Sequence, residues 1–152
     1  MKSPYPDWIF GYGSLIWRPD FEYIERRPAH IRGYTRRFWQ GSPDHRGTIE
    51  SPGRVVTLVP DTHHDCHGIA YRIDPAKKAD IVAALDHRES GGYTRIIHPV
   101  YVGEQHPCIV YVANPENPYF LGPKSIEEMA AHIDASAGPS GENRVYLLRL
   151  RS

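Results

Sequence analysis

The order of the expected elements constrains the fold of this chain more than any other feature of its sequence. Segments with strand-like patterns mostly come first, and they comprise residues 8–12, 29–40, 54–59, 66–73, 93–102 and 107–112. Residues 54–59 form a largely apolar run, which is typical of a strand covered on both faces. Helical patterns mostly follow the strands. This order predicts an α+β fold with a curved or barrel-like sheet and helices packed outside it.

The first helix is expected between two clear boundary signals. Pro75 suits the first turn of a helix, and the pair Gly91-Gly92 ends it. Residues 60–65 have the composition of a hairpin loop, so we expect the chain to reverse there. Residues 103–106 read as the turn between the last two strands.

Two later segments also favour helices. Residues 125–135 are amphipathic and begin with Ser125 and Glu128, which can form a capping box. Four residues are expected to form the apolar face of this helix: Ile126, Met129, Ala130 and Ile133. Residues 142–150 fit a helix or a strand, and we favour the helix.

Length and charge limit the class of protein. The chain has 152 residues, which is enough for one core, so residues 1–152 are expected to form a single domain. Its formal net charge is zero, which gives no general attraction to nucleic acid or to anionic membranes. We therefore expect a small-molecule substrate as the partner, no nucleic acid and no membrane, and a monomer.

The two cysteines and the N-terminal segment indicate the compartment. Cys66 and Cys108 lie in strand-like segments, where a free thiol packs as a small apolar residue. Two cysteines could form one disulfide but do not make up the framework of several disulfides that is typical of secreted domains. A reducing cytoplasm is therefore the simpler interpretation. The N-terminus shows no signal peptide, and no apolar run approaches the roughly 20 residues that span a bilayer. A cytoplasmic protein is expected.

A glycine-rich turn, Gly11-Tyr12-Gly13-Ser14, follows the first strand. Glycine permits positive φ and close approach of the backbone to a ligand. Successive N–H groups in such a turn can form a concave site for a carboxylate or a developing oxyanion. The segment matches neither the dinucleotide fingerprint nor the nucleophile elbow. A tight turn that only changes the direction of the chain fits it equally well.

A carboxylate lies at the expected end of the first helix. Ile81, Leu85 and Glu89 follow each other at intervals of four, so Glu89 continues the apolar face if the helix extends that far. Burial and the negative end of a helix dipole both raise the pKa of a carboxylate. A raised pKa suits a general base near neutral pH. A surface ion pair of Glu89 with Arg88 or Arg95 is the structural alternative.

Three other patterns suggest chemistry with less support. Residues 36–40 with 45–46 resemble a basic, aromatic nucleic-acid strip, but the neutral charge opposes that function, and an anionic small substrate suits these arginines as well. Residues 63–67 include three histidines, one aspartate and one cysteine, yet their spacing matches no structural zinc site. Ser14 could join a histidine in a hydrolytic triad. The chain has nine histidines, however, so such a pairing is easy to imagine and is weak evidence for a triad. No metal is expected.

An ordered series of segments resembles the ChaC-type γ-glutamylcyclotransferase family. The opening stretch is Ile9-Phe10-Gly11-Tyr12-Gly13-Ser14-Leu15-Ile16-Trp17, and a second is Leu85-Asp86-His87-Arg88-Glu89-Ser90-Gly91-Gly92-Tyr93. The remaining segments are 36–42, 44–47, 52–58, 68–72 and 137–143. They follow the order of the family and cover nearly the whole chain.

This resemblance implies a fold, an activity and site residues. The fold would be a small mixed β-barrel with flanking helices, and the activity would be cofactor-free cleavage of glutathione into 5-oxoproline and cysteinylglycine. By position, Glu89 matches the catalytic glutamate of the family. The substrate-binding loop matches Ile9, Phe10, Gly11, Tyr12, Gly13 and Ser14. The chain departs from the family at Val145, where glutamate is usual, and in ending at Ser152; both departures bear on substrate choice.

The residues support a mechanism for such a reaction. The α-amine of the γ-glutamyl group would attack its own γ-carbonyl, with Glu89 moving the proton and the N–H groups from Tyr12 to Leu15 holding the α-carboxylate or the oxyanion. Tyr12 and Tyr93 are candidate hydroxyl partners of the substrate or of Glu89. Another γ-glutamyl amine as substrate, or a binding module without activity, remain alternatives at this point.

Overall fold

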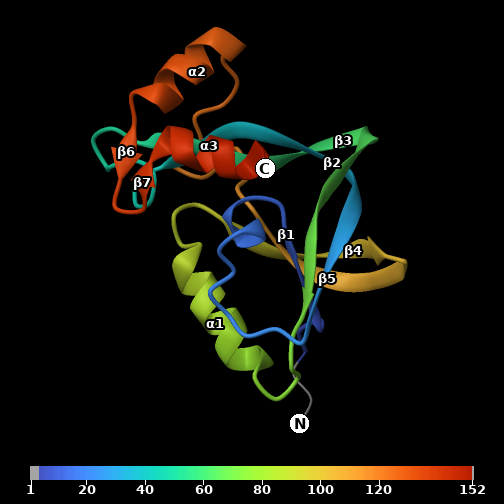
Figure 1. Cartoon of the computed structure of the whole chain (residues 1–152). Helices are drawn as coiled ribbons and strands as arrows, with labels where there is room; N and C mark the ends of the chain where they lie inside the picture. Colours follow the sequence, from blue (N-terminus) through green and yellow to red (C-terminus); the bar gives the residue numbers. More distant parts are fainter. Residues whose placement is uncertain (1–3, 152) are drawn as a thin grey trace.

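A computed structural model describes residues 4–151, and its strands close into a barrel (Figure 1). The barrel order is β1-β3-β2-β4-β5, and β5 runs parallel to β1 at the closure whereas the other pairs are antiparallel. Its strands are β1 (Trp8–Gly11), β2 (Glu25–Ser42), β3 (Gly53–Arg72), β4 (Thr94–Val102) and β5 (Glu104–Val112). The expected α+β class and mixed barrel are confirmed.

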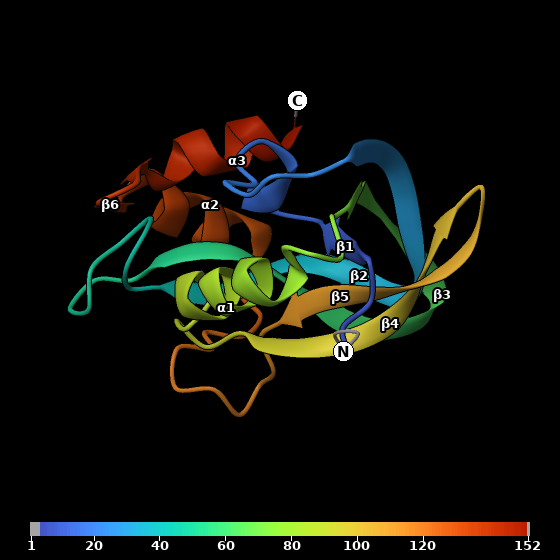
Figure 2. The same cartoon turned by 90° about the horizontal axis from the view of Figure 1, so that it is seen from below.

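Helices flank the barrel (Figure 2). The described elements outside it are η1 (Ser14–Ile16), α1 (Lys78–Arg88), α2 (Ile126–Asp134), α3 (Asn143–Arg151), β6 (Ala137–Gly138) and β7 (Gly141–Glu142). Alternation along the strands divides the core in two. Phe10 lies in a cluster with Ile31, Val56 and Val110, whereas Ile9 packs with Ile109 against the buried face of α1.

The strands β2 and β3 form one long, bent hairpin. Residues 43–52 connect them, so the expected reversal at residues 60–65 is wrong. The register shifts where Arg32 pairs with Asp65 and Tyr34 pairs with Pro60, which leaves residues 61–64 opposite Gly33. Such an irregularity bends a strand without ending it. Polar residues occur there because this part of β3 is exposed, and they gave it the composition of a loop.

The end of α1 is set by a tight turn. The helix begins at Lys78, after Pro75, because Asp74 accepts hydrogen bonds from Ala76 and Lys77 and forms a separate turn there. At the other end, the Glu89 N–H still bonds to the Leu85 carbonyl at 2.9 Å. Glu89 is therefore the C-cap of α1, and its side chain keeps the direction that the four-residue spacing predicts.

Gly92 is fixed by both its backbone conformation and its neighbours. Its φ is +109°, a region that favours glycine. A Cβ at this position would come within 2.6 Å of Gln40 Nε2 and 2.5 Å of Asn117 Oδ1. Gln40, which is fully buried, donates to the Gly91 carbonyl and exchanges two hydrogen bonds with Asn117. This pair holds the turn that follows Glu89.

The helix α2 is less buried than its pattern indicated. Ser125 Oγ accepts the Glu128 N–H at 3.1 Å, which confirms the expected N-cap. Of the expected apolar face, Ile133 is buried, but Ile126 is 79% exposed. That part of the prediction is wrong because only the C-terminal end of α2 reaches the neighbouring elements.

The helix α3 confirms our choice for residues 142–150, and an asparagine docks it on the barrel. Asn143 is fully buried, and its amide exchanges two hydrogen bonds with the main chain of Arg54, at 2.7 and 2.8 Å. One turn later, the Tyr146 hydroxyl accepts the Val56 N–H at 3.2 Å. These bonds fix α3 over β3 and determine where the Tyr146 ring lies.

We expect Gly92→Ala to destabilise the fold more than Gly33→Ala. Both glycines have positive φ, but a Cβ at Gly33 would meet nothing within 4 Å. Strain alone should lower the free energy of unfolding by about 1–3 kcal/mol in each variant. Displacement of Gln40 and Asn117 should add about 1–3 kcal/mol in Gly92→Ala. Urea denaturation of both variants measures this difference, and equal losses would show that the contacts at Gly92 contribute nothing.

Candidate active site

Two adjoining cavities lie where the end of β1, the end of α1 and the start of α3 meet. The inner cavity has a volume of about 350 Å³ and the outer cavity about 640 Å³, both including space open to solvent. Four residues border both cavities: Ser14, Glu89, Tyr93 and Tyr146. The two predicted features, the glycine turn and the carboxylate of Glu89, therefore meet in one site.

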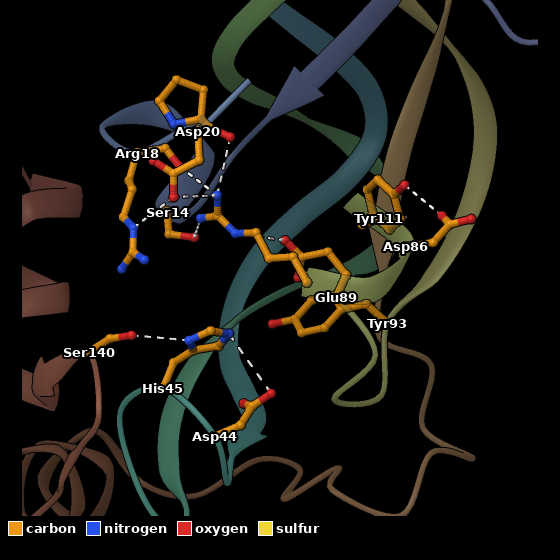
Figure 3. A network of polar contacts seen from close by, with 12 residues as sticks. Ser14, Arg18, Asp20, Asp44, His45, Asp86, Glu89, Tyr93, Tyr111 and Ser140 are labelled. Atoms are coloured by element: carbon orange, nitrogen blue, oxygen red, sulfur yellow. Dashed lines mark hydrogen bonds and ion pairs between the residues drawn. The ribbon is translucent and has the colours of Figure 1, made fainter. Parts of the chain in front are cut away.

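Glu89 is a carboxylate largely removed from water. Its side chain is 16% exposed, and the nearest cationic atom is Arg88 Nε at 3.8 Å. Burial raises the pKa of Glu89 to about 7; Arg88 opposes this rise and Asp44 adds to it. A carboxylate with this pKa can take and return a proton near neutral pH. In Figure 3, Glu89 and Tyr93 face the space between Ser14 and His45.

Arg88 joins the end of α1 to the segment that follows the glycine turn. Its guanidinium donates to Ser14 Oγ at 3.0 Å and to the carbonyls of Arg18 and Pro19 at 2.7 and 3.2 Å. Ser14 Oγ is thus engaged by an arginine and has no histidine partner among residues 4–151. The arrangement gives Ser14 a structural role and offers no support for a hydrolytic triad at this position.

The glycines of the turn are required for space. Neither Gly11 nor Gly13 has positive φ, so that part of the prediction is wrong. A Cβ on Gly11 would lie 2.7 Å from Leu15 Cβ, and one on Gly13 would lie 3.0 Å from the Tyr146 hydroxyl oxygen. The Ile16 N–H bonds to the Gly13 carbonyl, which tightens the turn into η1. The N–H groups just before it have no carbonyl partner within this helix.

The side chains of β1 and the turn divide between two environments. Phe10, Tyr12 and Leu15 line the inner cavity, whereas Ile9 packs toward α1 and lines neither cavity. The Tyr12 hydroxyl donates to the Tyr111 carbonyl. Arg36 supports the turn from β2, because its Nε donates to the Tyr12 carbonyl at 2.8 Å. This bond gives one arginine of the basic strip a structural function.

The hydroxyl of Tyr93 is also engaged by the main chain. It donates to the Val56 carbonyl at 2.7 Å. The hydroxyl hydrogens of Tyr12 and Tyr93 thus bond to main-chain carbonyls, while each hydroxyl oxygen can still accept a hydrogen bond. Their expected role as partners of the substrate or of Glu89 stays a prediction. What Tyr93 presents to both cavities is its ring.

Tyr146 is a site residue that sequence reasoning missed. It comes from α3, far from the glycine turn in sequence, and it borders both cavities. Its hydroxyl accepts the Val56 N–H, so its own hydrogen remains available to a second partner. Burial raises the pKa of Tyr146, and the hydroxyl keeps that hydrogen at neutral pH. The neighbouring Val145 is 39% exposed and borders neither cavity.

The outer wall carries a second group of polar residues, to which the sequence assigned no catalytic role. His45 Nδ1 lies 3.0 Å from Ser140 Oγ, and His45 Nε2 lies 3.8 Å from Asp44 (Figure 3). The second distance is too long for a hydrogen bond, so these residues do not form the oriented array of a serine hydrolase. All three line the outer cavity.

Within residues 4–151, no three His, Cys, Asp or Glu side chains gather so that they could hold a metal ion. In the same residues, no helix combines the length and the apolar character needed to cross a bilayer.

Known proteins are similar to this chain in sequence and in fold. Residues 7–152 match the family described as ChaC-like protein. The glutathione-specific γ-glutamylcyclotransferase 1 of Danio rerio is 45% identical over 94% of this chain and 76% of its own length. The enzyme of that name from Homo sapiens is 46% identical over 97% of this chain and 69% of its own length.

A solved structure extends the comparison to three dimensions. The crystal structure of the selenomethionine-labelled γ-glutamyl cyclotransferase specific to glutathione from yeast superposes with a TM-score of 0.88 at 33% identity. The superposition covers 95% of this chain and 84% of the yeast chain. The family match spans the glycine turn, Glu89 and Tyr146, and on this basis the chain belongs to the ChaC-like family.

Proposed function

We propose that this protein is a γ-glutamylcyclotransferase that cleaves glutathione into 5-oxoproline and cysteinylglycine. The names of its relatives in fish, human and yeast support this activity. The observation that carries the proposal is Glu89, a buried carboxylate with a pKa of about 7 at the junction of two cavities. The proposed reaction needs a base of this kind.

The substrate supplies its own nucleophile. The α-amine of the γ-glutamyl group attacks the γ-carbonyl carbon, a five-membered ring forms, and the bond to the cysteine nitrogen breaks. Orientation of such an intramolecular attack can lower the barrier by about 7–11 kcal/mol. The protein therefore has to fold the substrate, move a proton and stabilise an oxyanion, and this scheme calls on neither a protein nucleophile nor a cofactor.

Glu89 moves the proton in this scheme. An α-ammonium group has a pKa of about 8, close to that of the buried Glu89 carboxyl, so a proton passes between them at little cost. Glu89 takes the proton from the ammonium, which frees the amine for attack. It then returns the proton to the leaving nitrogen of cysteinylglycine as the bond to the γ-carbon breaks. The ring nitrogen gives up a second proton when the lactam forms, and this proton ends on the released amine of cysteinylglycine.

The inner cavity holds the γ-glutamyl group. The N–H groups from Tyr12 to Leu15 face the α-carboxylate, and the ring of Tyr93 packs against the substrate. The Tyr146 hydroxyl lies close to Gly13, since a Cβ built on Gly13 would be 3.0 Å from the hydroxyl oxygen. This oxygen accepts the Val56 N–H, and the hydroxyl hydrogen has no partner among the described residues. We assign this hydroxyl to the oxyanion that develops on the γ-carbonyl.

Glu89→Gln should abolish most of the activity because it keeps the shape of the side chain and removes the base. We expect kcat for release of 5-oxoproline from glutathione to fall by about 10²–10⁴-fold. Asp80→Asn is the matched control, since Asp80 is an exposed carboxylate on the same helix. Wild-type turnover in Glu89→Gln would refute the mechanism, and no turnover of glutathione or other γ-glutamyl amines by the wild type would refute the function.

The pH dependence of activity should follow Glu89. Only the carboxylate form accepts a proton, so kcat/KM should decrease as pH falls through about 7, the raised pKa of Glu89. Asp44 raises that pKa, and Asp44→Asn should therefore move the acidic limb to lower pH. Asp80→Asn should leave the limb in place. An unchanged or upward-shifted limb in Asp44→Asn would contradict the proposed electrostatics.

Tyr146→Phe and Tyr93→Phe should separate the roles of the two hydroxyls that bracket Val56. The Tyr146 hydroxyl accepts a bond from Val56 and keeps a hydrogen to donate, whereas the Tyr93 hydroxyl donates its hydrogen to Val56. Loss of an oxyanion donor should reduce kcat by about 10²–10³-fold in Tyr146→Phe, with KM little changed. Tyr93→Phe should mainly lower the melting temperature. Equal kcat values in the two variants would exclude the oxyanion role.

A further inference from the structure

The lining of the outer cavity carries positive charge. Three arginines line it: Arg18, Arg46 and Arg88. On the proposed function, the γ-glutamyl group occupies the inner cavity and its carbonyl lies beside Glu89. The leaving peptide must then extend into the outer cavity, where these arginines lie.

Two of the three arginines are neutralised by carboxylates of the protein. Arg18 Nε bonds to Asp20 at 2.9 Å. Arg88 lies 3.5 Å from Asp20 and 3.8 Å from Glu89, and it also donates to three oxygen atoms of residues 14–19. Both charges are therefore paired within the protein, and the side chain of Arg18 is also 51% exposed to solvent.

Arg46 differs from both. It lies in the connection between β2 and β3, and the residue is only 7% exposed. Its Nη1 donates to the Glu142 carbonyl at 3.1 Å, and its guanidinium lies 5.8 Å from the centre of the Tyr146 ring. Among residues 4–151, no Asp or Glu forms an ion pair with it. A buried charge without a counter-ion is costly, and arginines in such positions commonly serve an anionic ligand.

The surroundings of Arg46 increase this cost. Burial lowers the pKa of Arg46, and the charges of Arg18 and Arg149 lower it further. Tyr146 opposes this shift. No buried nitrogen of the described side chains lacks a hydrogen-bond partner, so the donors that Arg46 does not use within the protein are not fully buried, and Arg46 lines the outer cavity.

We propose that Arg46 binds the carboxylate at the far end of the leaving peptide and thereby selects γ-glutamyl peptides over γ-glutamyl amines that lack this group. In glutathione, the group is the glycine carboxylate. It would provide the counter-ion that Arg46 lacks within the protein. A planar guanidinium suits this ligand because it can donate two parallel hydrogen bonds to a carboxylate. Arg46 is then a specificity-determining residue of the outer cavity.

The test compares glutathione with glutathione whose glycine carboxylate is an amide, by the rate of 5-oxoproline release. The wild type should prefer the acid by about 10–100-fold in kcat/KM, the effect of one charged hydrogen-bonded pair. Arg46→Gln should lose most of this preference, through slower turnover of glutathione and little change with the amide. Arg46→Lys keeps the positive charge and should therefore recover part of the preference for glutathione over its amide. Arg144→Gln is the control, because Arg144 is exposed and pairs with Glu142 outside the cavity.

Each outcome decides between the parts of the proposal. A wild-type enzyme that turns over glutathione and its amide equally would overturn the role of Arg46 and leave the proposed function intact, even if Arg46→Gln does not fold. A folded Arg46→Gln variant that keeps the full preference for glutathione over its amide would also overturn the role of Arg46. A wild type that releases 5-oxoproline from neither substrate would refute the proposed function, and the role of Arg46 with it.

Discussion

The removal of the Glu89 carboxylate from water is the interaction on which the rest of the site depends. Burial raises the pKa of this group, and Asp44 acts in the same direction. Arg88 opposes both, but at 3.8 Å it lies beyond hydrogen-bonding distance of the carboxylate. The balance leaves the pKa of Glu89 at about 7, where both protonation states are populated at neutral pH. A direct Arg88–Glu89 bond would lower this pKa and weaken the base.

Remote parts of the chain have to meet for this balance to exist. The turn at Gly92, held by Gln40 and Asn117, directs Glu89 into the space beside the barrel. Arg88 then ties the end of α1 to the segment after the glycine turn. The amide of Asn143 docks α3 on β3, which places Tyr146 over Gly13. The barrel is the frame that brings these three elements to the same end of β1.

The features that could be predicted from the sequence were those set by a local pattern, such as the inward Glu89, or by the resemblance to a family, such as the mixed barrel. The four-residue spacing of Ile81, Leu85 and Glu89 predicted the inward carboxylate correctly, because α1 keeps its direction to the last turn. The positive φ expected of the glycines in the turn is wrong, and the contact of Gly13 with Tyr146 that requires a glycine exists only once α3 is docked. Tyr146 could not be found this way, since its significance depends on contacts between distant segments. Arg46 belonged to the basic strip for which an anionic small substrate was one interpretation, but only the fold shows that it is buried without an ion pair. Residues 60–65 were misassigned because an exposed strand and a loop have the same polar composition.

The charges of the proposed substrate explain why a site built around one carboxylate needs cationic or hydrogen-bonding groups on both sides of it. Glutathione carries two carboxylates and one ammonium. Glu89 attracts the ammonium and repels both carboxylates, so each carboxylate must be held by donors of its own. On the proposed function, the N–H groups from Tyr12 to Leu15 meet the first in the inner cavity and Arg46 meets the second in the outer cavity. With both ends held, the only mobile charge beside Glu89 is the ammonium proton, which is the charge that the reaction has to move.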